Sequence, residues 1–415
     1  MRKCRIGTAK FFTLLLLLYR TSVNAEEVRQ QLNFAEKIQL HDVTLRDGEQ
    51  QAGLVFSHDD KIAIAERLAE VGIHRIEAGM PAVSAADAKA VADIVKRNLG
   101  PKIFSFARCM KADIDKVADS GAEGVVIEIP ASRRFIERAY GWTLEKAIAL
   151  SVEATSYARE RGLYTVFFPI DGSRAQFDDF MQIVTAVAKD GHMDALGCVD
   201  TMGVLSPSSI SFAIRKMKQA TGKPIEVHCH DDFGMGSANT LLALAAGADV
   251  AHTTVSSLGE RFGNASYEEV ALSLLCMYGV NLGLQYDKLY ETAQAIRKIA
   301  GIEDRPNRPI TGPCISQIES GIIAGWYKNC QDDPREILPY LYQLTGHPGP
   351  EIVLGKSSGI ASIELALDKL GLECSSKEIK RELLDEVKTL SAERKALISL
   401  DEFQILAQKI FARNH

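Results

Sequence analysis

Between residues 38 and 258, short apolar runs alternate with longer stretches in which apolar residues recur every three or four positions. The short runs have the length and the residue types of strands, and there are eight of them, at 38–45, 73–79, 102–108, 124–130, 164–170, 195–201, 225–230 and 250–258. Eight strands, each followed by a helix, over about 240 residues are the number and size of a (β/α)8 barrel, or TIM barrel. We therefore predict an α/β fold with a TIM-barrel domain over residues 36–282.

The main alternative to a closed barrel is an open, doubly wound sheet. Such a sheet usually carries a glycine-rich, phosphate-binding turn after its first strand, whereas here the first run ends in the charged segment TLRDGEQ. The helical stretches also have clear limits, since Ser57 and Thr143 are expected N-caps and Gly72 and Gly162 are expected stops. These features favour the barrel, and the open sheet stays as the alternative.

The pattern changes after the predicted barrel. Helical periodicity continues, but the segments DRPNRPITGP and TGHPGPE interrupt it with residues that break helices. We predict that residues 283–415 form a mostly helical C-terminal region of linker and small subdomains.

The first 25 residues, MRKCRIGTAKFFTLLLLLYRTSVNA, have a basic start, a short apolar run and a small-residue end. This pattern is typical of a secretory signal, and the run is shorter than the ~20 residues that cross a bilayer. The eight cysteines, however, are scattered without a Cys-x-x-Cys pair, as in proteins with reduced thiols. We predict a leader at residues 1–30 and a location in the cytoplasm or an organelle matrix; secretion and a misassigned start codon are the alternatives.

The composition excludes some partners. The net charge is −6 and the sequence has a pI of about 5.9, with no basic stripe or arginine-rich arm. A nucleic-acid partner is therefore not expected, and no membrane partner is expected either.

Polar residues gather where the predicted strands end. His228 and His230 are two apart in a strand and therefore share one face. Asp47 follows the first strand and Asn264 follows the last, and the carboxyl ends of barrel strands meet at one mouth. One carboxylate and two neutral imidazoles form a partial shell for a divalent cation, to which Asn264 could add an oxygen. The sequence does not decide whether the cation is Mg, Mn, Zn, Co or Fe.

Each of these signals also has a structural explanation. A His-x-His pair in a strand is often a matter of packing, and Arg46–Asp47 could be an ion-paired turn. Gly-Asn is a common turn dipeptide. The prediction of a metal site therefore depends on their coincidence at strand ends. Arg46 beside the cation would stabilise the oxygen of a metal-bound 2-oxo acid as it becomes negative, and Thr201 and Arg174 are candidates for holding its carboxylate.

Five segments resemble the homocitrate synthase and 2-isopropylmalate synthase family of metal-dependent aldolase and lyase barrels. They are DVTLRDGEQ (42–50), IEAGMPA (76–82), CVDTMG (198–203), HCHDDFGMGSANTLLALAAGADV (228–250) and SSLGERFGNASYEEV (256–270). The resemblance covers about residues 38 to 280 and extends more weakly through LGKSSGIASIELAL (354–367).

The resemblance implies a Claisen-type condensation, in which the enolate of an acyl-CoA, usually acetyl-CoA, attacks a 2-oxo acid and thioester hydrolysis releases CoA. It implies a homodimer as well. It also implies a set of roles: Asp47, His228 and His230 as metal ligands with Asn264, Arg46 and Glu77 as catalytic residues, and Gln50, Arg174 and Thr201 as substrate-binding residues. Arg46 would stabilise the developing alkoxide, and Glu77 would help to position the oxo acid.

The chain departs from the family's pattern at three places. Ile318 and Ile323 stand where the family has histidines, one of which assists the acid–base step; Ile170 replaces an acid, and Ser357 replaces a histidine. An isoleucine cannot transfer a proton, so another group, such as His347, Glu319 or a thiol, would have to do so. The alternatives are an aldolase or lyase that acts on a 2-oxo or hydroxy acid without CoA, and a decayed paralogue with a binding role.

Overall fold

The computed structural model describes residues 25–303 and 305–413. The chain forms two compact units, and the boundary lies between Glu303 and Asp304. Helix α12 (Leu289–Ala300) belongs to the first unit, so this unit extends beyond the last strand and helix of the barrel. Most of the expected leader lies outside the described residues, and its last six residues form helix α2 (Ala25–Gln30).

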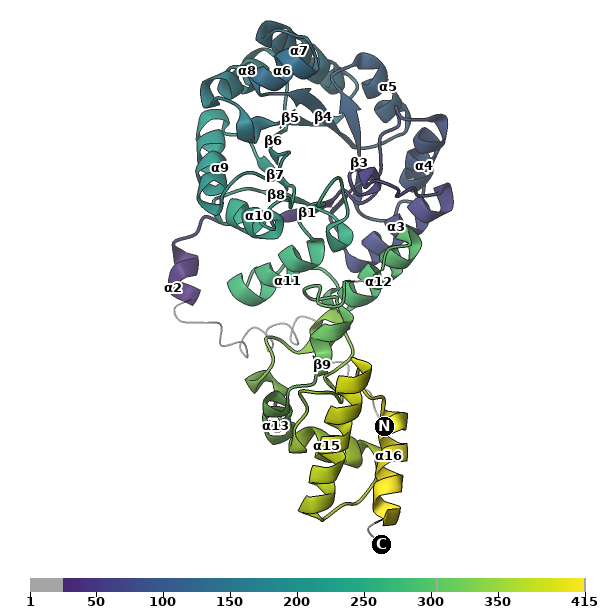
Figure 1. The fold of residues 1–415 in the computed structure, drawn as a ribbon. Helices are drawn as coiled ribbons and strands as arrows, with labels where there is room; N and C mark the ends of the chain where they lie inside the picture. The colour runs from purple at the N-terminus through teal and green to yellow at the C-terminus, as the bar shows by residue number, and fades with distance from the viewer. Residues whose placement is uncertain (1–24, 304, 414–415) are drawn as a thin grey trace, which may run out of the picture. The chain divides into compact units, whose positions relative to one another are not determined.

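The first unit contains a closed ring of eight parallel strands, which confirms the TIM barrel over the open sheet (Figure 1). The ring follows the order of the sequence, with β1 Gln39–Asp42, β2 Arg75–Glu77, β3 Lys102–Arg108, β4 Gly124–Pro130, β5 Tyr164–Ile170, β6 Ala195–Asp200, β7 Ile225–Cys229 and β8 Val250–Thr253. Strand β1 closes the ring by pairing with β8 from Gln39↔Val250 to Asp42↔Thr253.

Helices surround this ring (Figure 1). They are α3 His58–Val71, α4 Ala85–Lys96, α5 Lys111–Asp119, α6 Arg133–Ala139, α7 Leu144–Glu160, α8 Phe177–Asp190, α9 Pro207–Thr221, α10 Gly236–Ala245 and α11 Tyr267–Tyr278. The expected caps are present: the Ser57 side chain accepts a hydrogen bond from the backbone of Asp60, Thr143 caps α7, and Gly72 ends α3 with a φ of 88°.

Five strands, β1, β2, β6, β7 and β8, are shorter than their apolar runs. The eighth run was expected to continue to residue 258, but β8 ends at Thr253 and a short 3-10 helix, η3 (Val255–Ser257), follows. Ser256 and Ser257 have φ values of 54° and 56°, in the left-handed region, which is incompatible with an extended strand. The backbone therefore turns away from the ring just before the loop that carries Asn264.

The interior of the barrel has an apolar part and a polar part. Alternate residues of β3, β4, β5 and β6 form an apolar cluster of Phe104, Phe106, Val126, Val166, Phe168 and Val199. Alternate residues of β1, β2, β7 and β8 are instead charged or imidazole side chains, and all of them are buried. Glu77 ends β2 and His228 is the last but one residue of β7, so this polar part adjoins the carboxyl-terminal mouth of the barrel.

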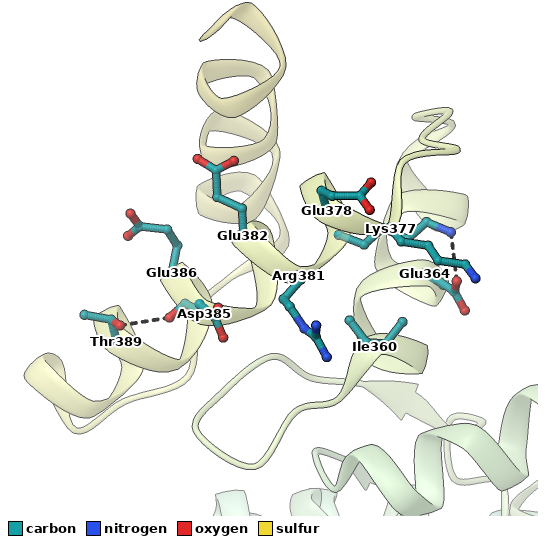
Figure 2. A pocket seen from close by; sticks show the side chains of 10 residues that line it. Ile360, Glu364, Lys377, Glu378, Arg381, Glu382, Asp385, Glu386 and Thr389 are labelled. Atoms are coloured by element: carbon teal, nitrogen blue, oxygen red, sulfur yellow. Dashed lines mark hydrogen bonds and ion pairs between the residues drawn. The ribbon is translucent and has the colours of Figure 1, made fainter. Parts of the chain in front are cut away.

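The second unit is mostly helical, as predicted. It contains α13 (Gly321–Asn329), α14 (Ile360–Leu370), α15 (Lys377–Arg394) and α16 (Leu400–Arg413), with a short parallel sheet of β9 (Gln317–Ile318) and β10 (Glu351–Ile352). Leu367, Leu383, Val387, Phe403 and Ile410 are among the residues that form its core. This unit contains a pocket of about 800 Å³, lined mainly by charged side chains of α15 together with Ile360 and Glu364. Figure 2 shows these lining side chains.

No helix in residues 25–303 or 305–413 is long and apolar enough to cross a membrane. The cysteines of the described part are all free thiols: Cys109, Cys198, Cys229, Cys276, Cys314, Cys330 and Cys374.

Candidate metal centre and active site

The structure brings the three predicted metal ligands together at the mouth of the barrel. The two Nε2 atoms of His228 and His230 lie 3.4 Å apart, because His228 lies in β7 and His230, two residues later, directly follows the strand on the same face. The Asp47 Oδ2 atom lies 3.7 Å from the Nε2 of His228 and 3.9 Å from that of His230. All three side chains are buried, and one ligand atom of each lies within 4.8 Å of the others.

Asn264 joins this group through Asp47. Its Nδ2 atom donates to Asp47 Oδ1 at 2.7 Å and to the carbonyl of Leu258 at 3.1 Å. Its Oδ1 atom is buried and has no hydrogen-bond partner in the described part of the chain. Since a buried acceptor without a partner carries a free-energy cost, this oxygen fits a further ligand of the same cation.

The loop that presents Asn264 requires glycine at two positions. Gly259 and Gly263 have φ values of 145° and 84°. A Cβ on Gly263 would lie 1.7 Å from the carbonyl oxygen of Ser257, and one on Gly259 would lie 2.2 Å from Asn264 Nδ2. The sequence Gly-Glu-Arg-Phe-Gly-Asn thus permits the loop to pass close to Asp47.

The protonation state of the donor residues also suits a divalent cation. Burial, and then the charges of His230 and His252, lower the pKa of His228 well below its usual value. The His228 imidazole is therefore neutral, which is the form that binds metals. The Nδ1 atom of His230 lies 3.2 Å from the carbonyl oxygen of Gly263, an outer contact that orients its Nε2 toward Asp47.

Arg46 lies against this group, as predicted for a residue that stabilises negative charge. Its Nη1 donates to Asp47 Oδ2 at 2.7 Å, its Nε donates to Glu77 Oε1, and its guanidinium lies 4.3 Å from the centre of the Phe106 ring. Its Nη2 atom is buried and has no hydrogen-bond partner among the described residues. Its two N–H bonds thus remain free to donate to an oxygen bound at the site.

Glu77 holds Arg46 in place from the end of β2. Burial raises the pKa of Glu77, but the charge of Arg46 and the contact with His41 outweigh this effect and lower it to about 2. The Glu77 carboxylate is therefore ionised at neutral pH. Since it is fully buried under Arg46, the structure places it as a partner of the guanidinium.

A second buried polar group lies deeper in the barrel, and the sequence analysis did not identify it. Glu226 Oε1 accepts from Arg75 at 2.6 Å, and Glu226 Oε2 lies 2.9 Å from His252 Nε2 and 3.9 Å from His41 Nδ1. His41 in turn lies 3.2 Å from Glu77. His41, Glu226 and His252 also have the spacing of a metal-binding group, but Arg75 and His252 already pair with Glu226, so this group fits a network that supports Glu77.

Strand alternation could have revealed this network. Glu226 precedes His228 by two residues and therefore shares its inward face, and His41 and His252 are opposite each other in the β1–β8 pairing. What the sequence could not show was the stagger between neighbouring strands, which decides which inward side chains meet.

The predicted substrate-binding residues lie around the same mouth but not in one cluster. The Thr201 hydroxyl accepts a hydrogen bond from the backbone of Asp171 at 2.7 Å, and Arg174 Nε donates to the Asp171 carboxylate at 2.6 Å. Gln50 ends the short helix η1 (Gly48–Gln50) and is exposed. The backbone N–H of Gln50 donates to the carbonyl oxygen of Asp47 at 2.9 Å, but in the described chain no side-chain hydrogen bond or ion pair joins these three residues to the metal ligands.

Glu128 is a further candidate that the sequence analysis missed. It lies on β4, two residues after Val126 of the inner apolar cluster, and pairs in register with Phe168 of β5. The Phe168 ring lies 5.3 Å from that of His228. Burial raises the pKa of the Glu128 carboxyl, an effect that Arg46 and Arg108 oppose. A carboxyl with a raised pKa near Arg46 is suited to proton transfer.

Comparison with known proteins places this site in a family. Residues 37–296 match the model of the HMGL-like family. A probable 2-isopropylmalate synthase of Ignicoccus hospitalis is 39% identical over 88% of this chain and 90% of its own length. A putative (R)-citramalate synthase of Archaeoglobus fulgidus is 37% identical over 88% of this chain and 74% of its own. A homocitrate synthase of Methanopyrus kandleri is 34% identical, with coverages of 89% and 91%.

Solved structures agree on the fold. An HMG-CoA lyase of Bacillus subtilis has a TM-score of 0.58 and 19% identity, and covers 65% of this chain and 96% of its own. An HMG-CoA lyase of Brucella melitensis has a TM-score of 0.57 and 22% identity, with coverages of 64% and 100%. The predicted resemblance is thus confirmed, and the chain belongs to the HMGL-like family, in which its relatives include 2-isopropylmalate, citramalate and homocitrate synthases.

Proposed function

We propose that this chain is a metal-dependent acyltransferase that condenses an acyl-CoA, with acetyl-CoA as the first candidate, with a 2-oxo acid. The observation that carries this proposal is the convergence of Asp47, His228 and His230 beside Arg46 at the mouth of the barrel. The names of the relatives support the same reaction class, since each is a synthase of a branched or extended hydroxy acid.

Asp47, His228 and His230 would hold the divalent cation, with the Oδ1 atom of Asn264 as a fourth donor. When bound there, such a cation would polarise the carbonyl group of the oxo acid. Arg46 would donate its free Nη2–H to the same oxygen, which becomes negative as the new carbon–carbon bond forms. Glu77 would keep Arg46 aimed at this point.

Around this centre, Thr201 and Arg174 would hold the carboxylate of the oxo acid, and Gln50 would contact the substrate from the exposed end of η1. Glu128 would act as the base in place of the missing histidines. It would take a proton from the α-carbon of the acyl-CoA, and the resulting enolate would attack the carbonyl carbon of the oxo acid. Hydrolysis of the thioester would then release CoA as the free thiol.

The test is release of a free thiol from acetyl-CoA that depends on an added 2-oxo acid. Pyruvate, 2-oxoisovalerate, oxaloacetate and 2-oxoglutarate should each be assayed with a divalent cation, using the H228A/H230A variant as the inactive control. Turnover of an oxo or hydroxy acid without acyl-CoA would instead support the lyase function. Binding of metal and oxo acid without any turnover would support the decayed paralogue.

We also propose that the protein acts as a homodimer in the cytoplasm or an organelle matrix. Free thiols throughout the described residues support a reducing compartment. Light scattering coupled to size-exclusion chromatography would give the mass of the assembly, and a C-terminal fluorescent fusion would show its location.

A further inference from the structure

A pocket of about 500 Å³ lies between the segment that follows β4 and the turn that follows β5. The first wall contains Ser132 and four residues of α6, which are Arg134, Phe135, Arg138 and Ala139. Asp171 and Arg174, in the turn after β5, form the other wall. Both segments leave the carboxyl ends of their strands, so the pocket opens on the same rim of the barrel as the metal ligands.

Arg174 is held in a fixed direction. Its Nε donates to Asp171 Oδ1 at 2.6 Å, and the other oxygen of that carboxylate accepts from the hydroxyl group of Ser132. Asp171 is buried, whereas the Arg174 side chain is 47% exposed. The guanidinium is therefore anchored at one edge, and its two remaining nitrogen atoms are available to a ligand.

Of the three arginines of α6, the two that line the pocket have no carboxylate partner among the described residues. Within the described residues, neither Arg134 nor Arg138 forms an ion pair, and both are exposed. Their neighbour Arg133 differs, because it forms two bonds to Asp179 at 2.9 and 2.7 Å. The pocket thus contains three guanidinium groups and one carboxylate, which is a net charge of +2.

An aromatic surface continues from the pocket. The ring centres of Phe135 and Tyr140 lie 5.7 Å apart, and those of Tyr140 and Trp142 lie 4.8 Å apart. Phe135 lines the pocket, and Tyr140 is 38% exposed. Guanidinium groups bind phosphates by paired hydrogen bonds, and exposed aromatic rings stack on the faces of nucleic-acid bases. Arginines beside exposed aromatic rings can therefore bind both the phosphates and the base of a nucleotide.

We propose that this pocket binds the nucleotide part of coenzyme A, with its phosphates on Arg134 and Arg138 and its adenine on the rings of Phe135, Tyr140 and Trp142, while Arg174 faces the oxo acid. The proposal rests on the proposed acyl-CoA substrate. In this proposal, the segment after β4 positions the acyl-CoA and takes no part in the chemical step. The same arginines could also receive the second carboxylate of a dicarboxylic oxo acid, and the experiments below separate the two.

Binding is measured first, because it does not depend on turnover. Calorimetric titrations of the metal-loaded full chain would use CoA, adenosine 3′,5′-bisphosphate and pantetheine. Each of R134Q and R138Q should weaken the binding of CoA and of the bisphosphate about tenfold, while pantetheine binding stays the same. The matched control is R133Q, which removes one charge from the same helix outside the pocket and should bind CoA like the wild type. Equal CoA affinity in all four proteins would overturn the proposal.

Kinetics then identify the ligand. The KM for acetyl-CoA should rise about tenfold in R134Q and in R138Q, and the KM for S-acetylpantetheine, which lacks the nucleotide, should not change. A rise in the KM for oxaloacetate or 2-oxoglutarate, with an unchanged KM for acetyl-CoA, would overturn the proposal in favour of the oxo acid. Loss of CoA binding in the variants, with no thiol release in the wild type, would support the pocket and refute the proposed function.

Discussion

Replacing Gly263 by alanine tests whether the tight loop before Asn264 shapes the metal site. Gly263 has a φ of 84°, where an alanine costs about 1–2 kcal/mol. Its added Cβ would also lie 1.7 Å from the backbone oxygen of Ser257, so the loop must shift, at a further cost of about 1–3 kcal/mol. We therefore expect G263A to lose about 2–5 kcal/mol of the free energy of unfolding.

Gly162 supplies the matched control for this prediction. It has a similar φ of 78°, but an added Cβ would meet no atom within 4 Å, and it precedes β5 at the opposite end of the barrel. G162A should lose only about 1–2 kcal/mol in urea unfolding followed by circular dichroism. G263A should also weaken Mn²⁺ binding in a calorimetric titration, whereas G162A should not. Equal losses of stability and unchanged Mn²⁺ affinity in both variants would refute the reasoning.

Three further substitutions test individual residues. In R46K, a single ammonium nitrogen replaces the planar guanidinium whose separate nitrogen atoms face Glu77, Asp47 and the bound oxygen, so kcat for thiol release should fall about 10²- to 10³-fold; an unchanged kcat would remove Arg46 from the reaction. In the wild type, kcat should rise with pH through the raised pKa of Glu128, and E128Q should lose this rise; an identical pH profile would exclude Glu128 as the base. Burial raises the pKa of Asp42 to about 7, so the folded state keeps a proton that the unfolded chain has already lost between about pH 4 and 7. Wild-type stability should therefore fall over that range relative to D42N, by up to about 4 kcal/mol in urea unfolding, and a constant difference would contradict the shift.

The fold was largely predictable from the sequence for a physical reason. Strands of a parallel barrel are covered on both faces, so they appear as continuous apolar runs separated by amphipathic helices. The runs at 102–108, 124–130 and 164–170 match β3, β4 and β5 residue for residue. The eighth run was too long because the left-handed conformation of Ser256 and Ser257 depends on the loop that they enter, and periodicity carries no information about it.

The candidate site was predictable in part. The group of Asp47, His228 and His230 followed from one rule, that parallel strands present their carboxyl ends at one mouth. The buried network around Glu226 was not identified, although side-chain alternation could have indicated it, because its exact pairing depends on the stagger between neighbouring strands. Glu128 was missed for the same reason: its proximity to Arg46 depends on the geometry of the closed ring.

The most direct test of the account is the number of divalent ions that the chain binds. Equilibrium dialysis against Mn²⁺ and Zn²⁺, with metal analysis by mass spectrometry, should find one ion per chain in the wild type. It should find none in H228A/H230A, and one in H58A/H192A, which removes two histidines outside the site. Retention of the ion by H228A/H230A, with the stoichiometry and affinity of the wild type, would contradict the central claim that Asp47, His228 and His230 hold a common cation.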